Sequence, residues 1–174
     1  YGSWRSPYCP DPRQFHRHTL AHLNEGSLFW VYLGHGSKQS LDRVVVPGKS
    51  YHILNSTDLD KVDCRAGPPI VIFLSCYTAA YDGKEPSLGE RLLHLQHGPI
   101  AVYGGSRVTM PYAMAVMGES LLRQVFDEGR PTLGELILHA KREMVLQEPA
   151  QRTTQRRLID VMARTLSPST HTLE

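Results

Sequence analysis

The chain has 174 residues, of which 41% are hydrophobic and 21% charged, and its formal net charge is +2 at pH 7. This composition is typical of one globular domain with a substantial core, here expected over residues 1–174. Basic residues are scattered apart from Arg152–Arg157, so a nucleic-acid partner is not indicated. No apolar run approaches the roughly 18 residues needed to cross a bilayer, and membrane insertion is not expected. The three cysteines leave at least one thiol free.

An irregular lead-in over residues 1–12 and a first helix open the predicted order of elements. Asp11 is a typical helix cap and Pro12 fits the first turn. The helix is expected to end at residues 24–26, Asn-Glu-Gly. Its apolar stripe consists of Phe15, Leu20 and Leu23.

Two apolar runs predict strands that are buried on both faces. The first, LFWVYL over residues 28–33, ends in Gly34-His35-Gly36, and the second, IVIFL over residues 70–74, ends in Ser75-Cys76. Open α/β sheets place their chemistry at the carboxyl ends of parallel strands. If these two strands are parallel neighbours, His35 faces Cys76 across one edge of the sheet.

The connection between these strands is expected to hold two minor elements. Residues 44–46 form a short apolar segment, interpreted as a minor or edge strand. Residues 51–54 then lead into Asn55–Asp58, whose polar side chains cap a short helical turn around Leu59 and Val62.

The segment after Cys76 begins with a loop, Tyr77–Pro86, whose position predicts contact with a substrate. Ser87 and Glu90 form a capping box for the next helix. The core face of this helix is expected to comprise Leu88, Leu92, Leu93 and Leu95. A third strand is predicted over residues 100–103, followed by Gly104-Gly105.

Helices are predicted for most of the remaining chain, over residues 114–128, 132–146 and 151–166, with a flexible tail over residues 167–174. Strands that alternate with helices favour a mainly parallel sheet. The predicted fold class is therefore α/β, as a three-layer α/β/α sandwich.

Cys76 and His35 are the residues best suited to chemistry. A cysteine nucleophile reacts as the thiolate, with a base beside it and donors for the oxyanion that its attack creates. Gly36 lets the backbone approach a bound carbonyl closely, so the amides of Gly36 and Cys76 are candidate oxyanion donors. The plainer alternative is that Cys76 is an ordinary buried cysteine.

Other candidate sites are weaker. His18 and His22 lie four residues apart on one helix and could hold a metal ion, but no cysteine or carboxylate nearby completes a zinc set. A solvated helix face is favoured, and no metal is expected. Cys9 and Cys64 lack a C-x-x-C partner and are interpreted as structural. Gln39 stands where the dinucleotide-binding motif G-x-G-x-x-G needs its third glycine, so a dinucleotide-binding domain is disfavoured. No glycines flank Cys76 as they flank the nucleophile of an α/β-hydrolase, so that class is disfavoured as well.

Several motifs together resemble those of a known family. They are YLGHGS, IVIFLSCYTA, SLGERLL, GPIAVYGGSRVT and PTLGELILHAKREM, within about residues 20–144. They are similar to motifs of the caspase-like cysteine peptidases of clan CD, and within the clan to the gingipain family. CHAT domains are the second choice, because residues 74–78 resemble their cysteine motif as well.

The resemblance implies a caspase-like fold and a cysteine endopeptidase that needs no cofactor. Cys76 would be the nucleophile, His35 the general base, and the Gly36 and Cys76 amides the oxyanion hole. A peptide could add as a strand along residues 104–110. The candidate substrate-binding residues are Gly34, Ser75, Tyr77, Asp82, Ser106 and Arg107. Arg107 suits an acidic side chain and Asp82 or Glu85 a basic one, and the sequence leaves this choice open.

One departure from the family concerns the residues before His35. Family members carry earlier strands there, so the domain is expected to be a fragment that lacks upstream strands and whose partners include other domains of a longer chain. A location in the secreted or cell-surface class would follow from the family, and the sequence itself leaves the compartment open. The rival to an active peptidase is a catalytically silent binding or scaffold module.

Overall fold

The computed structural model describes residues 11–129 and 132–146, and the chain divides into two compact units, Tyr1–Thr109 and Met110–Glu174. The single domain over residues 1–174 stays a prediction. The predictions for residues 1–10, with Cys9, and for the helix and tail over residues 151–174 lie outside the described residues.

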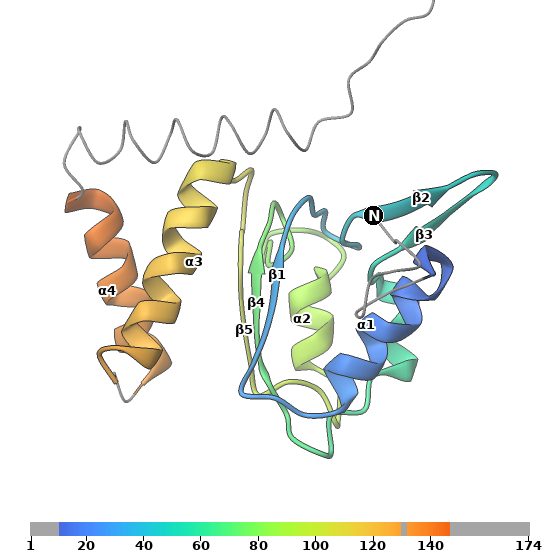
Figure 1. The fold of residues 1–174 in the computed structure, drawn as a ribbon, viewed down its shortest axis with the longest axis horizontal. Coiled ribbons are helices and arrows are strands. Elements are labelled where there is room, and N and C mark those ends of the chain that lie inside the picture. The colour runs from blue at the N-terminus through green and yellow to red at the C-terminus, as the bar shows by residue number, and fades with distance from the viewer. Residues whose placement is uncertain (1–10, 130–131, 147–174) are drawn as a thin grey trace, which may run out of the picture. The chain divides into compact units, whose positions relative to one another are not determined.

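Three parallel strands form the sheet of the first unit, as the sequence predicts. They are β1 (Phe29–Leu33), β4 (Ile70–Leu74) and β5 (Ala101–Gly104), in the order β1-β4-β5 (Figure 1). The predicted burial on both faces is wrong for the strand over residues 29–33, where Val31 and Leu33 are 44% and 60% exposed because this strand lies at the edge of the sheet. The pairing runs from Phe29 opposite Ile70 to Leu33 opposite Leu74. Because all three strands point the same way, the loops that follow them gather at one edge of the sheet.

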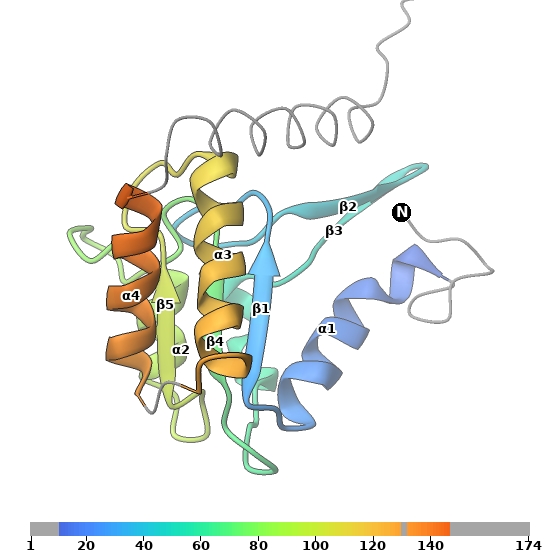
Figure 2. The same ribbon diagram turned by 60° about the vertical axis from the view of Figure 1, so that its left-hand side comes forward.

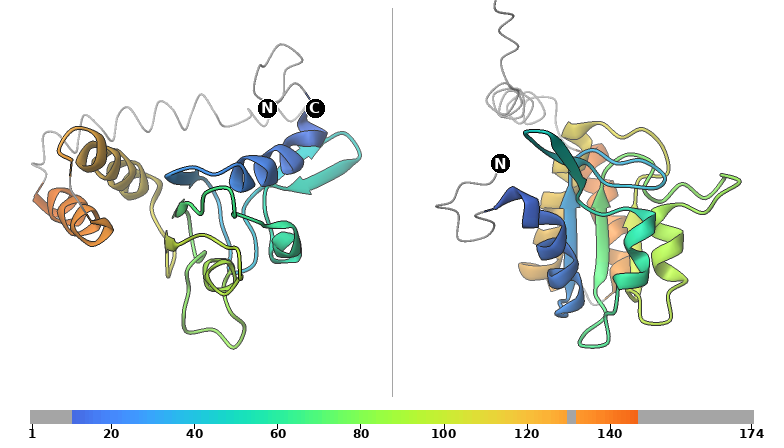
Figure 3. Two further views of the ribbon diagram at one scale, coloured as in Figure 1. Left: turned by 90° about the horizontal axis from the view of Figure 1, so that it is seen from below. Right: turned by 90° about the vertical axis from the view of Figure 1, so that its right-hand side faces the viewer.

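One face of the sheet packs against α1 (Phe15–Asn24), the 3-10 helix η2 (Ser56–Lys61) and α2 (Leu88–Leu93). Figure 1 shows α1 and α2 on the same side of the strands, and the right panel of Figure 3 looks onto this face. Trp30 contacts Phe73 edge-to-face, with ring centroids 6.2 Å apart. The buried cluster on this face comprises Leu20, Leu23, Tyr32, Leu41, Leu54, Leu59, Val62, Cys64, Val71, Phe73, Leu88 and Leu92.

The predicted helix starts are confirmed at three places. Asp11 caps the 3-10 turn η1 (Pro12–Gln14) by accepting the Arg13 N–H at 2.9 Å. Asn55 and Asp58 form a capping box on η2, and Ser87 and Glu90 form one on α2. Local side-chain acceptors therefore set these boundaries, which is why the sequence alone could locate them.

The predicted core face of α2 is wrong for Leu93, which is 49% exposed. Leu88 and Leu92 are fully buried because residues four apart share a helix face, and Leu93 points about 100° away from Leu92. Leu95 follows the helix and packs partly against the core. On α1, Leu20 and Leu23 are buried as predicted, while Phe15 is exposed.

A β-hairpin replaces the single minor strand that the sequence predicts. Strand β2 (Arg43–Val46) pairs antiparallel with β3 (Lys49–His52) through a turn at Pro47-Gly48, where Gly48 has φ +78°. The left-handed backbone at Gly48 closes this two-residue turn. Figure 2 shows the hairpin projecting from the sheet. Strand β3 escaped prediction because its sequence KSYH lacks an apolar alternation.

The second unit is a helical hairpin of α3 (Pro111–Phe126) and α4 (Leu133–Leu146), close to the predicted ranges. Helix α3 begins three residues before the predicted Met114, because Pro111 is well suited to the first turn. Glu143 of α4 accepts from Gln124 of α3 at 3.0 Å and pairs with Arg123. Within the two described stretches of chain, no helix has the length and apolar character to cross a membrane. The third layer of the predicted sandwich stays a prediction.

Candidate active site

The loops that follow β1 and β4 meet at the carboxyl edge of the sheet. A Cβ on Gly36 would lie 2.9 Å from the Cys76 carbonyl oxygen and 2.9 Å from Ser75 Oγ, so only glycine fits this approach. The two loops are joined further on, because the Leu88 N–H donates to the Lys38 carbonyl at 2.6 Å. His35 therefore belongs to a loop that packs against the Cys76 backbone, as the parallel pairing predicts. The side-chain pairing of His35 with Cys76 stays a prediction.

The Cys76 thiol contacts a residue that sequence reasoning did not single out, Thr109. The Thr109 N–H donates to Cys76 Sγ at 3.3 Å, and Thr109 Oγ1 lies 3.5 Å from the same sulfur. These two contacts lower the pKa of the half-buried Cys76 thiol below its ordinary value, with the hydroxyl contributing most. Thr109 lies 33 positions beyond Cys76 in the sequence, and although it ends the motif GPIAVYGGSRVT, nothing in that motif indicates a contact with sulfur.

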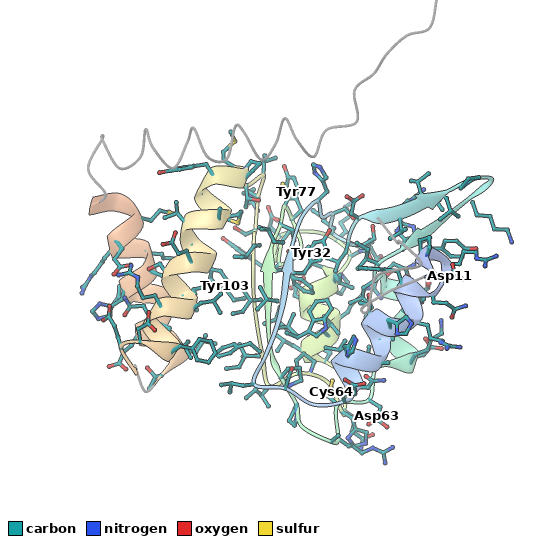
Figure 4. The ribbon with its side chains drawn as sticks, in the orientation of Figure 1. Asp11, Tyr32, Asp63, Cys64, Tyr77 and Tyr103 are labelled. Carbon is teal, nitrogen blue, oxygen red and sulfur yellow. The ribbon has the colours of Figure 1, made fainter. Side chains whose placement is uncertain are left out.

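Cys64 shows the opposite behaviour. Its thiol donates to the Leu23 carbonyl at 3.6 Å, and burial raises its pKa. Figure 4 shows Cys64 near the end of the sheet opposite to Tyr77, the neighbour of Cys76. The setting of Cys64 agrees with its interpretation as a structural cysteine, and the two thiols are chemically distinct.

The histidine turn is fixed by Tyr32 of β1, which is labelled in Figure 4. The Tyr32 hydroxyl donates to the His35 carbonyl at 2.8 Å and accepts the Asp42 N–H at 3.3 Å. Burial raises the pKa of Tyr32 to about 12, so the phenol keeps its proton and remains a donor. Gly34 is required here, since a Cβ at that position would lie 2.5 Å from the Tyr32 oxygen. His35 itself is exposed to solvent, while the Tyr32 hydroxyl holds its backbone in place.

A cavity of about 230 Å³ lies beside the histidine. His35 and Gly36 form part of its wall, and Asp42 and His52 from the hairpin region form another part. Nδ1 of His52 is buried without a hydrogen-bond partner in the described part of the chain. Sequence reasoning missed Asp42 and His52 as neighbours of His35, because the hairpin that brings them there was not predicted in full.

The loop after Cys76 is strained and firmly held. Tyr77 has φ +55°, an uncommon conformation for a residue with a side chain, and such strain gathers at functional sites. Its N–H donates to the Arg107 carbonyl at 3.2 Å, and the Ala79 N–H donates to the Gly105 carbonyl at 3.1 Å. The candidate substrate residue Ser75 is buried and lies 3.2 Å from Thr78 Oγ1, so its side chain holds the loop.

The candidate specificity residues Asp82 and Arg107 pair with each other. Two guanidinium nitrogens of Arg107 donate to the two Asp82 oxygens at 3.2 and 2.7 Å. The guanidinium carbon also lies 6.0 Å from the centroid of the Tyr81 ring. Glu85 pairs with Arg91 at 3.2 Å. The sequence left open whether these residues bind an acidic or a basic substrate side chain. In the structure Arg107, Asp82 and Glu85 are each already paired with an opposite charge. Ser106 precedes Arg107 in the same segment and is half-buried.

The helix histidines pair with carboxylates. His22 Nδ1 lies 2.9 Å from Glu25 Oε2, and His16 Nε2 lies 3.1 Å from Asp58 Oδ1. Residues 11–129 and 132–146 contain no cluster of three or more His, Cys, Asp or Glu side chains that could hold a metal ion.

The role of the Gly36 and Cys76 amides as oxyanion donors stays a prediction. The Cys76 N–H also faces its own sulfur, where, after the Thr109 contacts, it helps to lower the pKa of the thiol. In the described residues, no backbone carbonyl accepts a hydrogen bond from the Gly36 or Cys76 N–H. Both amides belong to the loops that meet at the carboxyl edge. The arrangement can supply a thiol with a lowered pKa and an exposed imidazole on the neighbouring loop.

Known proteins share this arrangement of elements. The family model of peptidase family C25 matches residues 1–163. The chain is similar to the solved structure of the Arg specific cysteine proteinase gingipain R, with 18% identity and a TM-score of 0.59, over 74% of this chain and 30% of that chain. It is also similar to the complex of Porphyromonas gingivalis RgpB pro- and mature domains, with 17% identity and a TM-score of 0.63, over 75% of this chain and 31% of that chain.

These matches confirm the resemblance to the gingipain family and the caspase-like α/β fold class. At this level of identity the two structures show the fold alone. The chain spans less than a third of the length of either matched chain. No curated protein matches the chain.

Proposed function

Because the chain belongs to peptidase family C25, we propose that it is a cysteine endopeptidase with Cys76 as nucleophile and His35 as general base. One observation carries the proposal: the loop of His35 packs against the backbone of a cysteine whose thiol pKa is lowered by two donors. A buried structural cysteine has a raised thiol pKa, as Cys64 does.

The reaction begins when His35 takes the proton of the Cys76 thiol and the resulting thiolate attacks the carbonyl carbon of a peptide bond. The carbonyl oxygen becomes an oxyanion, and the amides of Gly36 and Cys76 donate hydrogen bonds to it. His35 gives its proton to the leaving amine as the carbon–nitrogen bond breaks, which leaves a thioester on Cys76. His35 then takes a proton from a water molecule, whose oxygen attacks the thioester. The carbon–sulfur bond breaks, the carboxylic acid product leaves, and His35 returns the proton to the Cys76 sulfur.

The substrate is a peptide or protein chain in extended form. Strand β5 lies at one edge of the three-stranded sheet, and the segment that follows it carries Thr109 to the nucleophile. A substrate in extended form could therefore bind as an added strand along residues 104–110, beside Cys76. A partner domain is a second expected ligand, because one similar structure is a complex of pro- and mature domains.

Selective alkylation tests the proposal. The chain is treated with iodoacetamide or a peptidyl acyloxymethyl ketone near neutral pH, and the label is mapped by mass spectrometry. Rapid labelling of Cys76 that is slowed at least tenfold in His35→Ala is expected, since general-base catalysis contributes about 10²–10⁴-fold. Cys64 and Cys9 are internal comparators in the same molecule. Fluorogenic peptides with Arg, Lys, Asp or Asn before the cleaved bond then report the preferred substrate.

The opposite result would support the scaffold module. Labelling of Cys76 no faster than of Cys64, together with no cleavage of any peptide in the panel, would contradict the peptidase. Cys76→Ala is the control for contaminating peptidases, because it must abolish the cleavage while the protein stays folded.

A further inference from the structure

We propose that Thr109 stabilises the thiolate form of Cys76 through two donors, its backbone N–H and its side-chain hydroxyl. For its consequence in peptide hydrolysis, this assignment rests on the proposed function. Thr109 would then be a catalytic residue, since it touches the reacting sulfur.

The contacts around the sulfur differ between its two protonation states. The N–H at 3.3 Å donates to sulfur in either state, and the hydroxyl at 3.5 Å can donate its proton once the sulfur is ionised. The Thr109 carbonyl, 3.7 Å from Sγ, can accept the S–H only while the thiol is neutral. When the thiol ionises, the hydrogen bonds from the Thr109 N–H and hydroxyl become stronger, because a hydrogen bond to a charged acceptor is stronger than one to a neutral acceptor. The weak hydrogen bond from the S–H to the Thr109 carbonyl is lost.

Thr109 is held in position by the segment that precedes it. The Arg107 and Gly105 carbonyls accept from the Tyr77 and Ala79 amides, which ties this segment to the cysteine loop. Gly105 permits the contact, because a Cβ there would lie 2.4 Å from the Ser75 carbonyl oxygen. The donors thus face the sulfur before any substrate binds.

Charged neighbours do not replace the role of Thr109. The charged side chains on the loops around Cys76 are Lys38, Asp82, Lys84, Glu85 and Arg107. Arg107 pairs with Asp82 and Glu85 pairs with Arg91, and the printed contacts of the Cys76 sulfur in the described part of the chain all come from Thr109. The titratable neighbours are Tyr77, next in sequence, and His35, which adjoins the Gly36 that contacts the Cys76 carbonyl. We therefore expect part of the thiolate stabilisation to remain when His35 is removed.

The test measures the rate of iodoacetamide alkylation of Cys76 in the full chain from pH 5 to pH 10. The variants are Thr109→Val, which removes the hydroxyl and keeps the N–H, Thr109→Ala, which removes it without adding a methyl group, and Thr109→Ser, which restores it. Thr57→Val, at an exposed threonine of η2, is the matched control. Each variant is also measured in a His35→Ala background.

Thr109→Val and Thr109→Ala are expected to raise the midpoint of the pH profile by about one unit. Below the midpoints the rate then falls about three- to fourfold, because a tenfold loss of thiolate is partly offset by the higher nucleophilicity of that thiolate, and above the midpoints the rate rises about two- to threefold. Thr109→Ser and Thr57→Val should keep the wild-type midpoint. An unmoved midpoint in a folded Thr109→Ala protein would overturn the assignment.

The two proposals fail separately. If Thr109→Ala shifts the alkylation midpoint but the wild-type chain cleaves no peptide, the peptidase is wrong and the thiolate contact stands. If the chain cleaves peptides through Cys76 and the midpoint does not move, the peptidase stands and the role of Thr109 is wrong.

Discussion

Replacing Tyr32 by phenylalanine tests whether one hydroxyl fixes the histidine turn. The change keeps the ring in the core and removes only the oxygen that bridges the His35 carbonyl and the Asp42 N–H. Tyr32 is 9% exposed, so water cannot easily replace these bonds. Leaving a buried donor or acceptor without a partner costs about 1–3 kcal/mol. We expect Tyr32→Phe to lower the free energy of unfolding by that amount at pH 7.

At alkaline pH the difference in unfolding free energy between wild type and Tyr32→Phe is expected to shrink. Burial raises the Tyr32 pKa from 10.0 to about 12 in the folded chain, so the unfolded chain loses this proton first as pH rises. The wild-type protein therefore keeps this contribution below pH 10 and loses it between pH 10 and pH 12, up to about 2.7 kcal/mol for two pKa units. Tyr32→Phe has no such proton, and the gap between the two proteins should shrink as pH rises.

The assay is urea unfolding of both proteins at pH 7 and pH 11, with Tyr51→Phe on β3 as the matched control. Tyr51→Phe is expected to change the free energy of unfolding by less than about 0.5 kcal/mol. The rate of Cys76 alkylation is measured alongside, because a loosened His35 turn should slow it. Equal stability of Tyr32→Phe and wild type at pH 7, or a gap that does not shrink at pH 11, would refute the reasoning.

Two further changes test the packing of the loops and the charged pair. Gly36→Ala should lower the free energy of unfolding by about 1–3 kcal/mol in urea, because its Cβ would meet the Cys76 carbonyl oxygen at 2.9 Å. Gly134→Ala is the control: nothing lies within 4 Å of that Cβ, and the change should stabilise α4 by about 0.4–1 kcal/mol; equal effects of the two would contradict the loop contact. A double-mutant cycle on Arg107 and Asp82 should give a coupling of about 0.2–1 kcal/mol that weakens with salt, since both side chains are about half exposed. A coupling that salt leaves unchanged would show a desolvated pair instead.

The sequence alone could predict the sheet and the edge of it at which Cys76 lies. Two apolar runs that each end in small or polar residues indicated parallel strands, and the observed pairing of Leu33 with Leu74 follows. The caps at Asp11, Asn55 and Ser87 were predictable for a similar reason, because the acceptor and donor lie within three residues. Features that depend on short sequence separations or on apolar periodicity were therefore accessible.

Features that depend on distant contacts were not accessible. Thr109 reaches Cys76 only because β5 pairs with β4, and nothing within its own neighbourhood marks it as a sulfur ligand. Asp42 and His52 reach the cavity beside His35 through a hairpin whose second strand is polar. The pairing of Asp82 with Arg107 likewise joins two loops 25 positions apart.

A crystal structure of the chain with a peptidyl acyloxymethyl ketone bound to Cys76 would test the central claim most directly. The proposed mechanism predicts a thioether bond to Sγ, the inhibitor oxygen within about 3 Å of the Gly36 and Cys76 amides, and the His35 imidazole within hydrogen-bond reach of the reacting group. A covalent complex in which His35 points away and neither amide contacts the oxygen would contradict it.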